Sequence, residues 1–332
     1  MPGTGCAGTF IEQIDFRHPS NDSANPLTDP NLKPVKTQEI TGGFDHELSR
    51  TMSFGVRYSH KWLNRTIEDV GILVPGIGEV FYIANPGFGI AQHILGDQFP
   101  TTPKAKRDYD GVEFRLRKRL ANRWSTDTSF LISRLYGNYS GLASTDENGR
   151  TSPNVDRLFD GLYMSFDETG KPVYGRLATD RPFTFKSQTT YDLPWGTGLG
   201  AIFYAASGQP LSSQATIGNV PVFYKGRGNL GRLPMSLQTD INIQHGFRLP
   251  GHTRAEAEVS IINLFDQDIG NQIINTPYRD ALPISQNTGF FNGVDVDAIA
   301  AATSSVRKDA RYRQLSGFQN ARSMRFMVKF NF

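Results

Sequence analysis

Residue types that could bind a nucleotide occur at Gly226, Gly228 and Gly231, whose spacing matches a glycine-rich phosphate loop. A dinucleotide site needs a strand before this loop and a helix opening at its last glycine, because the helix N-terminus holds the phosphates. Here Pro234 follows within three residues and a new strand begins. The spacing therefore indicates a glycine-rich surface loop.

Candidate metal ligands are scattered along the chain. The six histidines form no pair spaced four residues apart on a helix, as a zinc site would favour: His18, His46, His60, His93, His245 and His252. Asn292, Asp295 and Asp297 faintly resemble an oxygen-rich calcium loop, but the downstream bidentate Glu is missing. A polar outer loop is the favoured interpretation, and we predict no metal.

Groups that could perform acid–base or nucleophilic chemistry are equally sparse. Glu256 and Glu258 lie two residues apart on a strand and so face the same side, which favours a lining role over glycosidase chemistry. Serine occurs in no GxSxG elbow, and the single cysteine, Cys6, has no partner for a disulfide or a metal cluster. We predict no catalytic residue, no cofactor and no enzymatic activity.

Composition points to an all-β protein. The 332 residues include 33 Gly, 19 Pro and 23 Phe, which are turn formers and β-favouring aromatics. Mean hydropathy is −0.39, and no stretch approaches the roughly 18 to 20 apolar residues of a spanning helix, which excludes a helical inner-membrane protein. The net charge of +3, from 35 basic and 32 acidic residues, is too small and dispersed for a nucleic-acid partner.

The last stretch of the chain shows a strict two-residue alternation. Apolar side chains take every second place and polar ones fill most of the places between: Met324, Phe326, Val328, Phe330 and Phe332. Successive strand side chains point to opposite faces, so this strand is apolar on one face and polar on the other. A final strand ending on Phe is typical of outer-membrane β-barrels. We therefore predict that Phe326, Val328, Phe330 and Phe332 form an assembly signal for the barrel assembly machinery; the alternative is an amphipathic strand of a soluble β-sandwich.

Two inner stretches repeat this pattern, and seven more are predicted as strands. Residues 52–62 alternate strictly, and 11 residues tilted by about 45° cover roughly 25 Å of membrane. In 109–120, four charged residues share one face and are predicted to line an aqueous lumen: Glu113, Arg115, Arg117 and Arg119. The other predicted strands are 35–48, 123–137, 182–193, 198–207, 235–249, 253–264 and 320–332.

The connections alternate between very short and very long. The short ones are Ser49-Arg50, Ala121-Asn122, 194–197 and 250–252; the long ones are roughly 64–108, 138–181, 208–234 and 265–319. Strict alternation puts all long loops on one side of the sheet, as in outer-membrane barrels with long loops outside the cell and tight turns in the periplasm. Trp124 and Trp195 beside turns, and Trp62 near the opposite end, match interfacial girdles.

The alternation of short and long connections also predicts on which side of the membrane each end of the chain lies. If the last strand ends in the periplasm, residues 1–34 are an extracellular loop remnant and 35–332 are the C-terminal portion of the barrel. Single-chain bacterial barrels have an even strand number, which nine strands do not satisfy. Residues 1–10 also lack the pattern of a signal peptide. We therefore expect the chain to be completed by a missing N-terminal barrel half.

Several short motifs, taken together, resemble one family. They are Pro30-Asn31-Leu32-Lys33-Pro34 before Gln38-Glu39, Ile67-Glu68-Asp69, Asn85-Pro86-Gly87-Phe88-Gly89, Tyr136-Gly137-Asn138-Tyr139-Ser140-Gly141, Ser207-Gly208-Gln209-Pro210 and Ile262-Asn263-Leu264-Phe265-Asp266. In order and spacing, from residue 28 to residue 332, the chain resembles the Oar-like TonB-dependent receptors. Individually, each motif is unspecific.

The resemblance implies an outer-membrane barrel of about 22 strands around an N-terminal plug, preceded by a carboxypeptidase-regulatory-like domain. Such receptors import a scarce or bulky solute with energy from the TonB complex, reached through the plug. This implies a bacterial outer-membrane receptor fragment that contacts outer-membrane lipid, the missing plug and an unidentified sugar, peptide or chelated metal. Ligand contacts would come from the loops 64–108, 138–181 and 265–319 and from Arg115 and Arg117. The alternatives are a passive structural barrel or adhesin, and a soluble β-sandwich carbohydrate-binding module.

Overall fold

The computed structural model describes residues 28–74, 78–92, 100–141, 159, 163–218, 220–250, 254–284 and 289–331. Phe332, the last residue of the predicted assembly signal, lies outside the described residues, as do Cys6, His18, His93 and His252. Most of the predicted loop remnant 1–34 lies outside them as well.

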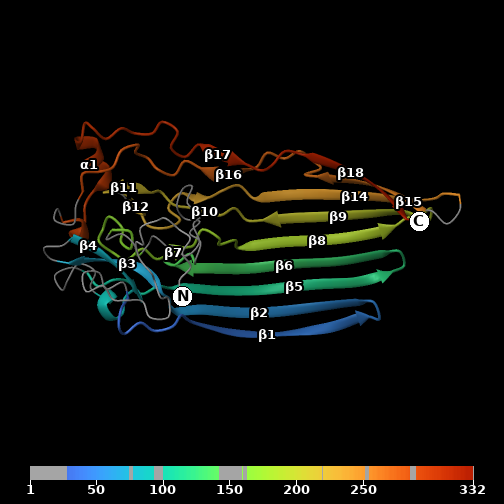
Figure 1. Cartoon of the computed structure of the whole chain (residues 1–332), viewed down its shortest axis with the longest axis horizontal. Helices are drawn as coiled ribbons and strands as arrows, with labels where there is room; N and C mark the ends of the chain where they lie inside the picture. The colour runs from blue at the N-terminus through green and yellow to red at the C-terminus, as the bar shows by residue number, and fades with distance from the viewer. Residues whose placement is uncertain are drawn as a thin grey trace, which may run out of the picture.

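Nine long strands form one antiparallel sheet in which each strand pairs with its neighbours in chain order (Figure 1). They are β1 (Lys36–Ser49), β2 (Met52–Arg65), β5 (Arg107–Ala121), β6 (Trp124–Gly137), β8 (Phe183–Asp192), β9 (Thr197–Ala206), β14 (Ser236–Arg248), β15 (Arg254–Ile262) and β18 (Ser323–Asn331). The short β7 (Gly175–Arg176) also pairs with β6. All nine predicted strands are confirmed, with small shifts at their ends.

The register places most of the apolar side chains on one face of the sheet, with exceptions such as Leu131, Ile202 and Met327 on the polar face. Phe114 lies opposite Phe130 on the next strand, and Phe326 lies opposite Val259 at the far edge. The apolar face is uncovered: Ile243 is 40% exposed and Phe330 is 53% exposed. In a β-sandwich a second sheet would bury these side chains, so the soluble sandwich alternative is wrong.

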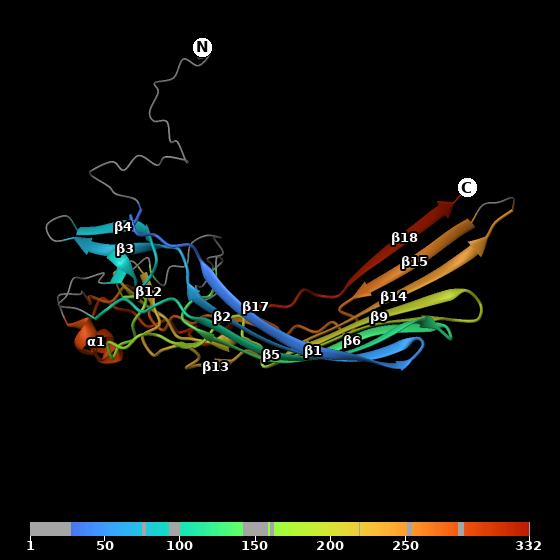
Figure 2. The ribbon, with the colours of Figure 1, turned by 90° about the horizontal axis from the view of Figure 1, so that it is seen from below.

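Short turns and long connections lie at opposite ends of the sheet. In Figure 1 the β1–β2, β5–β6 and β8–β9 turns share one end, while α1, β3 and β4 lie at the other; Figure 2 shows the sheet curving like a trough. We call these the turn end and the loop end. One predicted turn is shifted: Ala121 pairs with Trp124, so the turn is Asn122-Arg123, whose φ angles of 53° and 69° suit a two-residue hairpin.

The sheet is open at both sides. In the described part of the chain, β1 pairs only with β2, and β18 pairs only with β15. An unpaired strand edge leaves backbone N–H and C=O groups without partners, which is costly in hydrocarbon.

The long connections, predicted as loops, contain short elements of their own. They are β3 (Glu68–Val74), β4 (Gly78–Ala84), η1 (Gly89–Gln92), β10 (Pro210–Leu211), β11 (Ala215–Ile217), β12 (Val220–Val222), β13 (Gly231–Arg232), β16 (Gly270–Ile273), η3 (Phe290–Asn292), α1 (Val296–Ala302) and β17 (Leu315–Phe318). β3 pairs with β4, β10 with β13, β11 with β12 and β16 with β17.

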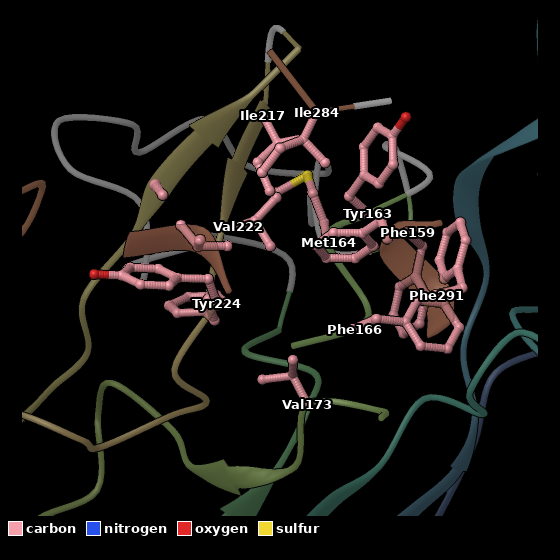
Figure 3. Packing of buried hydrophobic residues seen from close by; sticks show 14 of the residues in the cluster. Phe159, Tyr163, Met164, Phe166, Val173, Ile217, Val222, Tyr224, Ile284 and Phe291 are labelled. Carbon is pink, nitrogen blue, oxygen red and sulfur yellow. The ribbon is translucent and has the colours of Figure 1, made fainter. Parts of the chain in front are cut away.

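These connections pack together around a buried hydrophobic core, which we call the loop cluster (Figure 3). Phe159, Phe166 and Phe290 are almost fully buried in it. Phe291 stacks on Tyr163 with ring centroids 5.9 Å apart and meets Phe166 edge-on at 5.1 Å. Several loops from different parts of the chain thus share one aromatic core at the loop end.

Candidate functional site: the polar face and the loop cluster

The four charged residues predicted on 109–120 all lie on the polar face of β5. Cross-strand pairing sets Glu113 opposite Arg57, Arg115 opposite Gly55 and Arg117 opposite Ser53. The Arg119 side chain is exposed at the turn end of the same strand. That this face lines a lumen stays a prediction.

Arg115 is held by an acid that the sequence analysis missed. Its Nε lies 2.8 Å from Asp127 Oδ1 and its Nη2 lies 2.5 Å from Oδ2, a bidentate pair. Arg117 Nε approaches Asp127 Oδ2 at 3.6 Å. Both partners of the main pair are about 40% exposed, so this pair orients the arginines and adds roughly 0–1 kcal/mol of stability.

A hollow of about 260 Å³ opens beside these arginines on the polar face. Gly43 and Gly55 are among its lining residues, and charged side chains of both signs stand around it: Asp45, Arg57, Glu113, Arg115 and Arg117. A Cβ at Gly43 would collide with the Val56 carbonyl oxygen. Such a surface suits a polar or charged segment and offers little to an apolar one.

The other half of the polar face is dominated by amides and acids. Asn242 donates to Glu258 Oε1 at 2.6 Å and to Ser260 Oγ at 2.9 Å, and Ser260 also donates to Glu258 at 3.0 Å. Glu256 pairs with Gly246 in the same register, so both glutamates share this face, as their spacing predicted. Glu258 serves as a hydrogen-bond acceptor in a strand-to-strand network.

The residues of the predicted assembly signal that the structure describes lie on the opposite, apolar face. Phe326, Val328 and Phe330 are 74%, 62% and 53% exposed. They alternate with Arg325, Met327 and Lys329, which pair across to β15 on the polar side. Their exposure agrees with a lipid-facing surface, and their role in assembly stays a prediction.

A lysine missed by the sequence analysis is buried on the apolar side at the turn end. Lys118, only 7% exposed, donates through Nζ to the carbonyls of Ala121 at 2.6 Å and Trp124 at 2.7 Å. The ammonium also lies 4.1 Å from the centre of the Trp124 ring. Its charge is thereby neutralised locally by carbonyl dipoles and an aromatic face.

The tryptophans lie near the two ends of the strands. Trp195, in the β8–β9 turn, is 66% exposed, and Trp62 stacks on His60 with ring centroids 4.8 Å apart. His60 Nδ1 lies 2.8 Å from Asp110 Oδ1. His245 on β14 lies 2.7 Å from Thr197 Oγ1. His60 and His245 therefore link neighbouring strands of the sheet through side-chain contacts.

The loop cluster is tied together by one lysine that contacts two acids. Lys225 Nζ lies 2.5 Å from Glu168 Oε1 and 3.1 Å from Asp297 Oδ2, and each of these three residues comes from a different long connection. Tyr278 donates to Asp297 Oδ1 at 2.6 Å. Burial alone would lower the pKa of Lys225, but its hydrogen bonds to Glu168 and Asp297 raise this pKa above its ordinary value.

The Asn292–Asp297 stretch holds its acids in structural contacts. Asp295 caps α1 by accepting from the Ala298 amide at 2.9 Å, and Asp297 is engaged by Lys225. The polar-loop interpretation is thus supported over a calcium loop. In the described part of the chain, no group of three or more potential metal-ligating side chains is assembled. Gly226, Gly228 and Gly231 have φ angles of 75°, 76° and 85°, and the short strand β13 begins at Gly231 where a dinucleotide site would need a helix, as the loop interpretation predicted.

No helix among the described residues is both long and apolar enough to cross a membrane.

Comparison with known proteins gives the family resemblance. The chain is 29% identical over 264 residues to the TonB-dependent transporter Oar of Myxococcus xanthus. The chain is similar to Oar-like TonB-dependent transporters. The matched region is 78% of this chain but only 24% of Oar. No family model matches the chain.

Two solved structures match much of this chain at low identity. The ferric-catecholate import receptor Fiu of Escherichia coli matches 80% of this chain and 27% of its own, at 10% identity and a TM-score of 0.42. The outer membrane transporter YddB of Escherichia coli matches 74% of this chain and 30% of its own, at 11% identity and a TM-score of 0.47. The predicted antiparallel sheet is confirmed by the structure, and the predicted resemblance to Oar-like receptors is confirmed by the similarity to Oar.

Proposed function

We propose that this chain is the C-terminal wall of a TonB-dependent outer-membrane receptor that imports a solute. The observation that carries the proposal is the two-sided sheet: nine strands paired in chain order, apolar and exposed on one face, polar and charged on the other. The similarity to Oar supports it, because that relative is named a TonB-dependent transporter.

The proposal assigns a role to each part of the chain. Residues 35–332 form the C-terminal portion of the barrel, 1–34 lie on the side of the loop end, and the loop end faces the outside of the cell. The edges of β1 and β18 pair with the missing N-terminal barrel half, since open edges are costly in lipid. The polar face meets the plug, through which the TonB complex acts. The barrel assembly machinery reads Phe326, Val328, Phe330 and Phe332.

Solute contacts are proposed at the loop end and on the polar face of the sheet. The loop cluster supplies aromatic and charged groups from the connections 64–108, 138–181 and 265–319, and Arg115 and Arg117 supply cations below it. The proposed activity is binding and transport, with no catalytic residue.

The test compares three strains of the source bacterium: the parent, a strain lacking this chain and a strain lacking TonB. Spent medium is analysed for solutes that the parent depletes. We expect at least one solute to persist in the medium of both mutants. Persistence only in the TonB mutant would overturn the import proposal. Loss of surface attachment with unchanged depletion would favour the passive barrel or adhesin.

A further inference from the structure

The last long connection carries a concentrated group of cations. Residues 277–280 run antiparallel to 307–309: the Arg279 amide donates to the Arg307 carbonyl at 2.9 Å, and the Asp309 amide donates to the Pro277 carbonyl at 2.8 Å. We call these two segments, together with Arg311, the arginine ribbon. Tyr278 is buried in the loop cluster, which fixes the ribbon on that core.

Three guanidinium groups of the ribbon share two carboxylates. Arg307 binds Asp280 in a fork, with Nε–Oδ2 and Nη2–Oδ1 distances of 3.0 and 2.8 Å. Arg311 binds Asp309 in the same way, at 3.1 and 2.8 Å. Arg279 Nη2 approaches Asp309 Oδ1 at 3.5 Å. One positive charge is therefore left over, and the forks fix the planes of two guanidiniums.

The Asp309 carboxylate lies inside, the Asp280 carboxylate is partly exposed at 28%, and the guanidiniums lie outside. The Asp309 side chain is 5% exposed, whereas the side chains of Arg279, Arg307 and Arg311 are 45%, 69% and 60% exposed. In the described part of the chain, the Nη1 groups of Arg307 and Arg311 make no hydrogen bond. These N–H donors, held in position and directed toward solvent, match the geometry by which arginine binds phosphate or carboxylate.

The charges of the ribbon are stable over the physiological pH range. Hydrogen bonds from Arg307 hold the pKa of the Asp280 carboxyl at about 2, and Arg311 holds the pKa of Asp309 well below its usual range. The exposed Lys308, which also belongs to the ribbon, adds a further cation, so the ribbon carries four cations against two carboxylates.

We propose that the arginine ribbon binds a multiply charged oxyanion, a phosphate group or paired carboxylates, on the solute that the receptor imports. The proposal rests on the proposed function in assigning the anion to the solute. Anion binding itself needs neither TonB nor the plug.

The test is isothermal titration calorimetry on the complete receptor, this chain together with the rest of its barrel and plug, in detergent micelles. Sodium pyrophosphate and sodium citrate are the probes, because they separate phosphate from carboxylate chemistry, and maltose is the neutral control. We expect saturable binding of at least one anion and none of maltose. The double variant Arg307→Gln/Arg311→Gln should weaken binding by about tenfold or more, as expected for lost charge-assisted hydrogen bonds. Arg50→Gln, an exposed arginine in the β1–β2 turn at the opposite end of the sheet, should bind within about twofold of wild type, the size of a distant screened charge.

Asp280→Asn separates ligand binding from a merely structural role. Removing this opposing charge should tighten anion binding severalfold, whereas an ion pair that only shapes the loop would leave binding unchanged or weaken it. Circular dichroism and the heat-dependent gel shift check that each variant is folded. Absence of anion binding, wild-type affinity in the double variant, an equal loss in Arg50→Gln or no gain in Asp280→Asn would overturn the proposal. Anion binding without TonB-dependent depletion would remove only the import function.

Discussion

Lys118 offers the sharpest test of how this sheet tolerates a charge on its apolar side. The lysine lies opposite Met52 and Thr126 in the register, on the face that carries Leu116 and Phe114. Its ammonium is enclosed by backbone carbonyls of the β5–β6 turn and by the Trp124 ring. The perturbation is Lys118→Met, which keeps the length of the side chain and removes the charge.

The size of the effect follows from the contacts. Two charge-assisted hydrogen bonds, at 2.6 and 2.7 Å, contribute about 1.5–3 kcal/mol each. The cation–π contact adds about 0.5–2 kcal/mol. Against this, a lysine on the lipid face close to the membrane interface costs about 0–1 kcal/mol. Together these terms give an expected loss in the free energy of unfolding of about 2.5–8 kcal/mol for Lys118→Met, most of it from turn carbonyls left without a donor.

The assay is urea unfolding of the full chain in phospholipid vesicles, followed by circular dichroism. Lys186→Met is the matched control, because Lys186 is exposed on the polar face and should change the free energy of unfolding by less than about 0.5 kcal/mol. A Lys118→Met variant within about 1 kcal/mol of wild type would refute the carbonyl-cage reasoning.

Three further predictions follow from single contacts. Gly43→Ala should destabilise the sheet by about 1–3 kcal/mol, because its Cβ meets the Val56 carbonyl, whereas Gly42→Ala has open space and should be neutral; urea unfolding of both compares them directly. Lys225→Met should destabilise the folded loop cluster by about 1–2 kcal/mol, because it removes the contacts to Glu168 and Asp297. Limited proteolysis would detect this as faster cleavage of the loops with the sheet intact. Unchanged cleavage would show that Lys225 does not hold these connections together. The folded-state pKa of Asp280 is depressed to about 2, so its stabilising contribution is present above the ordinary carboxyl pKa and is lost only as the pH falls through about 2. Pepsin should therefore cleave the last loop of the wild-type chain slowly at pH 4 and should cleave the same loop of Asp280→Asn faster at that pH. Equal rates would contradict the assignment.

The sheet could be predicted from sequence because the same two-residue alternation of apolar and polar side chains recurs in its strands. Alternation of residues such as Phe54 and Gly55 fixes both the strand and its two faces, and the sharp contrast between short turns and long loops fixes the topology. The pairing of Arg115 with Asp127 could not be predicted. A two-residue turn at Asn122-Arg123 pairs Ala121 with Trp124, and continuing that register would set Arg115 opposite Phe130. An irregularity between Lys118 and Ala121 shifts the pairing by one residue and puts Asp127 within reach.

The loop cluster escaped prediction for a different reason. Its core residues, such as Phe166, Val222 and Phe290, come from separate connections and show no helical or strand period. They are buried by contacts between segments far apart in the chain, which no local pattern records. The arginine ribbon is likewise hidden, because Arg279 and Arg307 meet only when the last loop folds back on itself.

The central claim is that the apolar face meets lipid and the polar face meets water. It is tested most directly with spin labels at two adjacent positions of β14, Ile243→Cys and Gln244→Cys, each in a Cys6→Ser background and inserted in phospholipid vesicles. We predict that the label at position 243 is relaxed by dissolved oxygen and shielded from a water-soluble nickel complex, and that the label at position 244 shows the reverse. Equal access of the nickel complex to both labels would contradict the account.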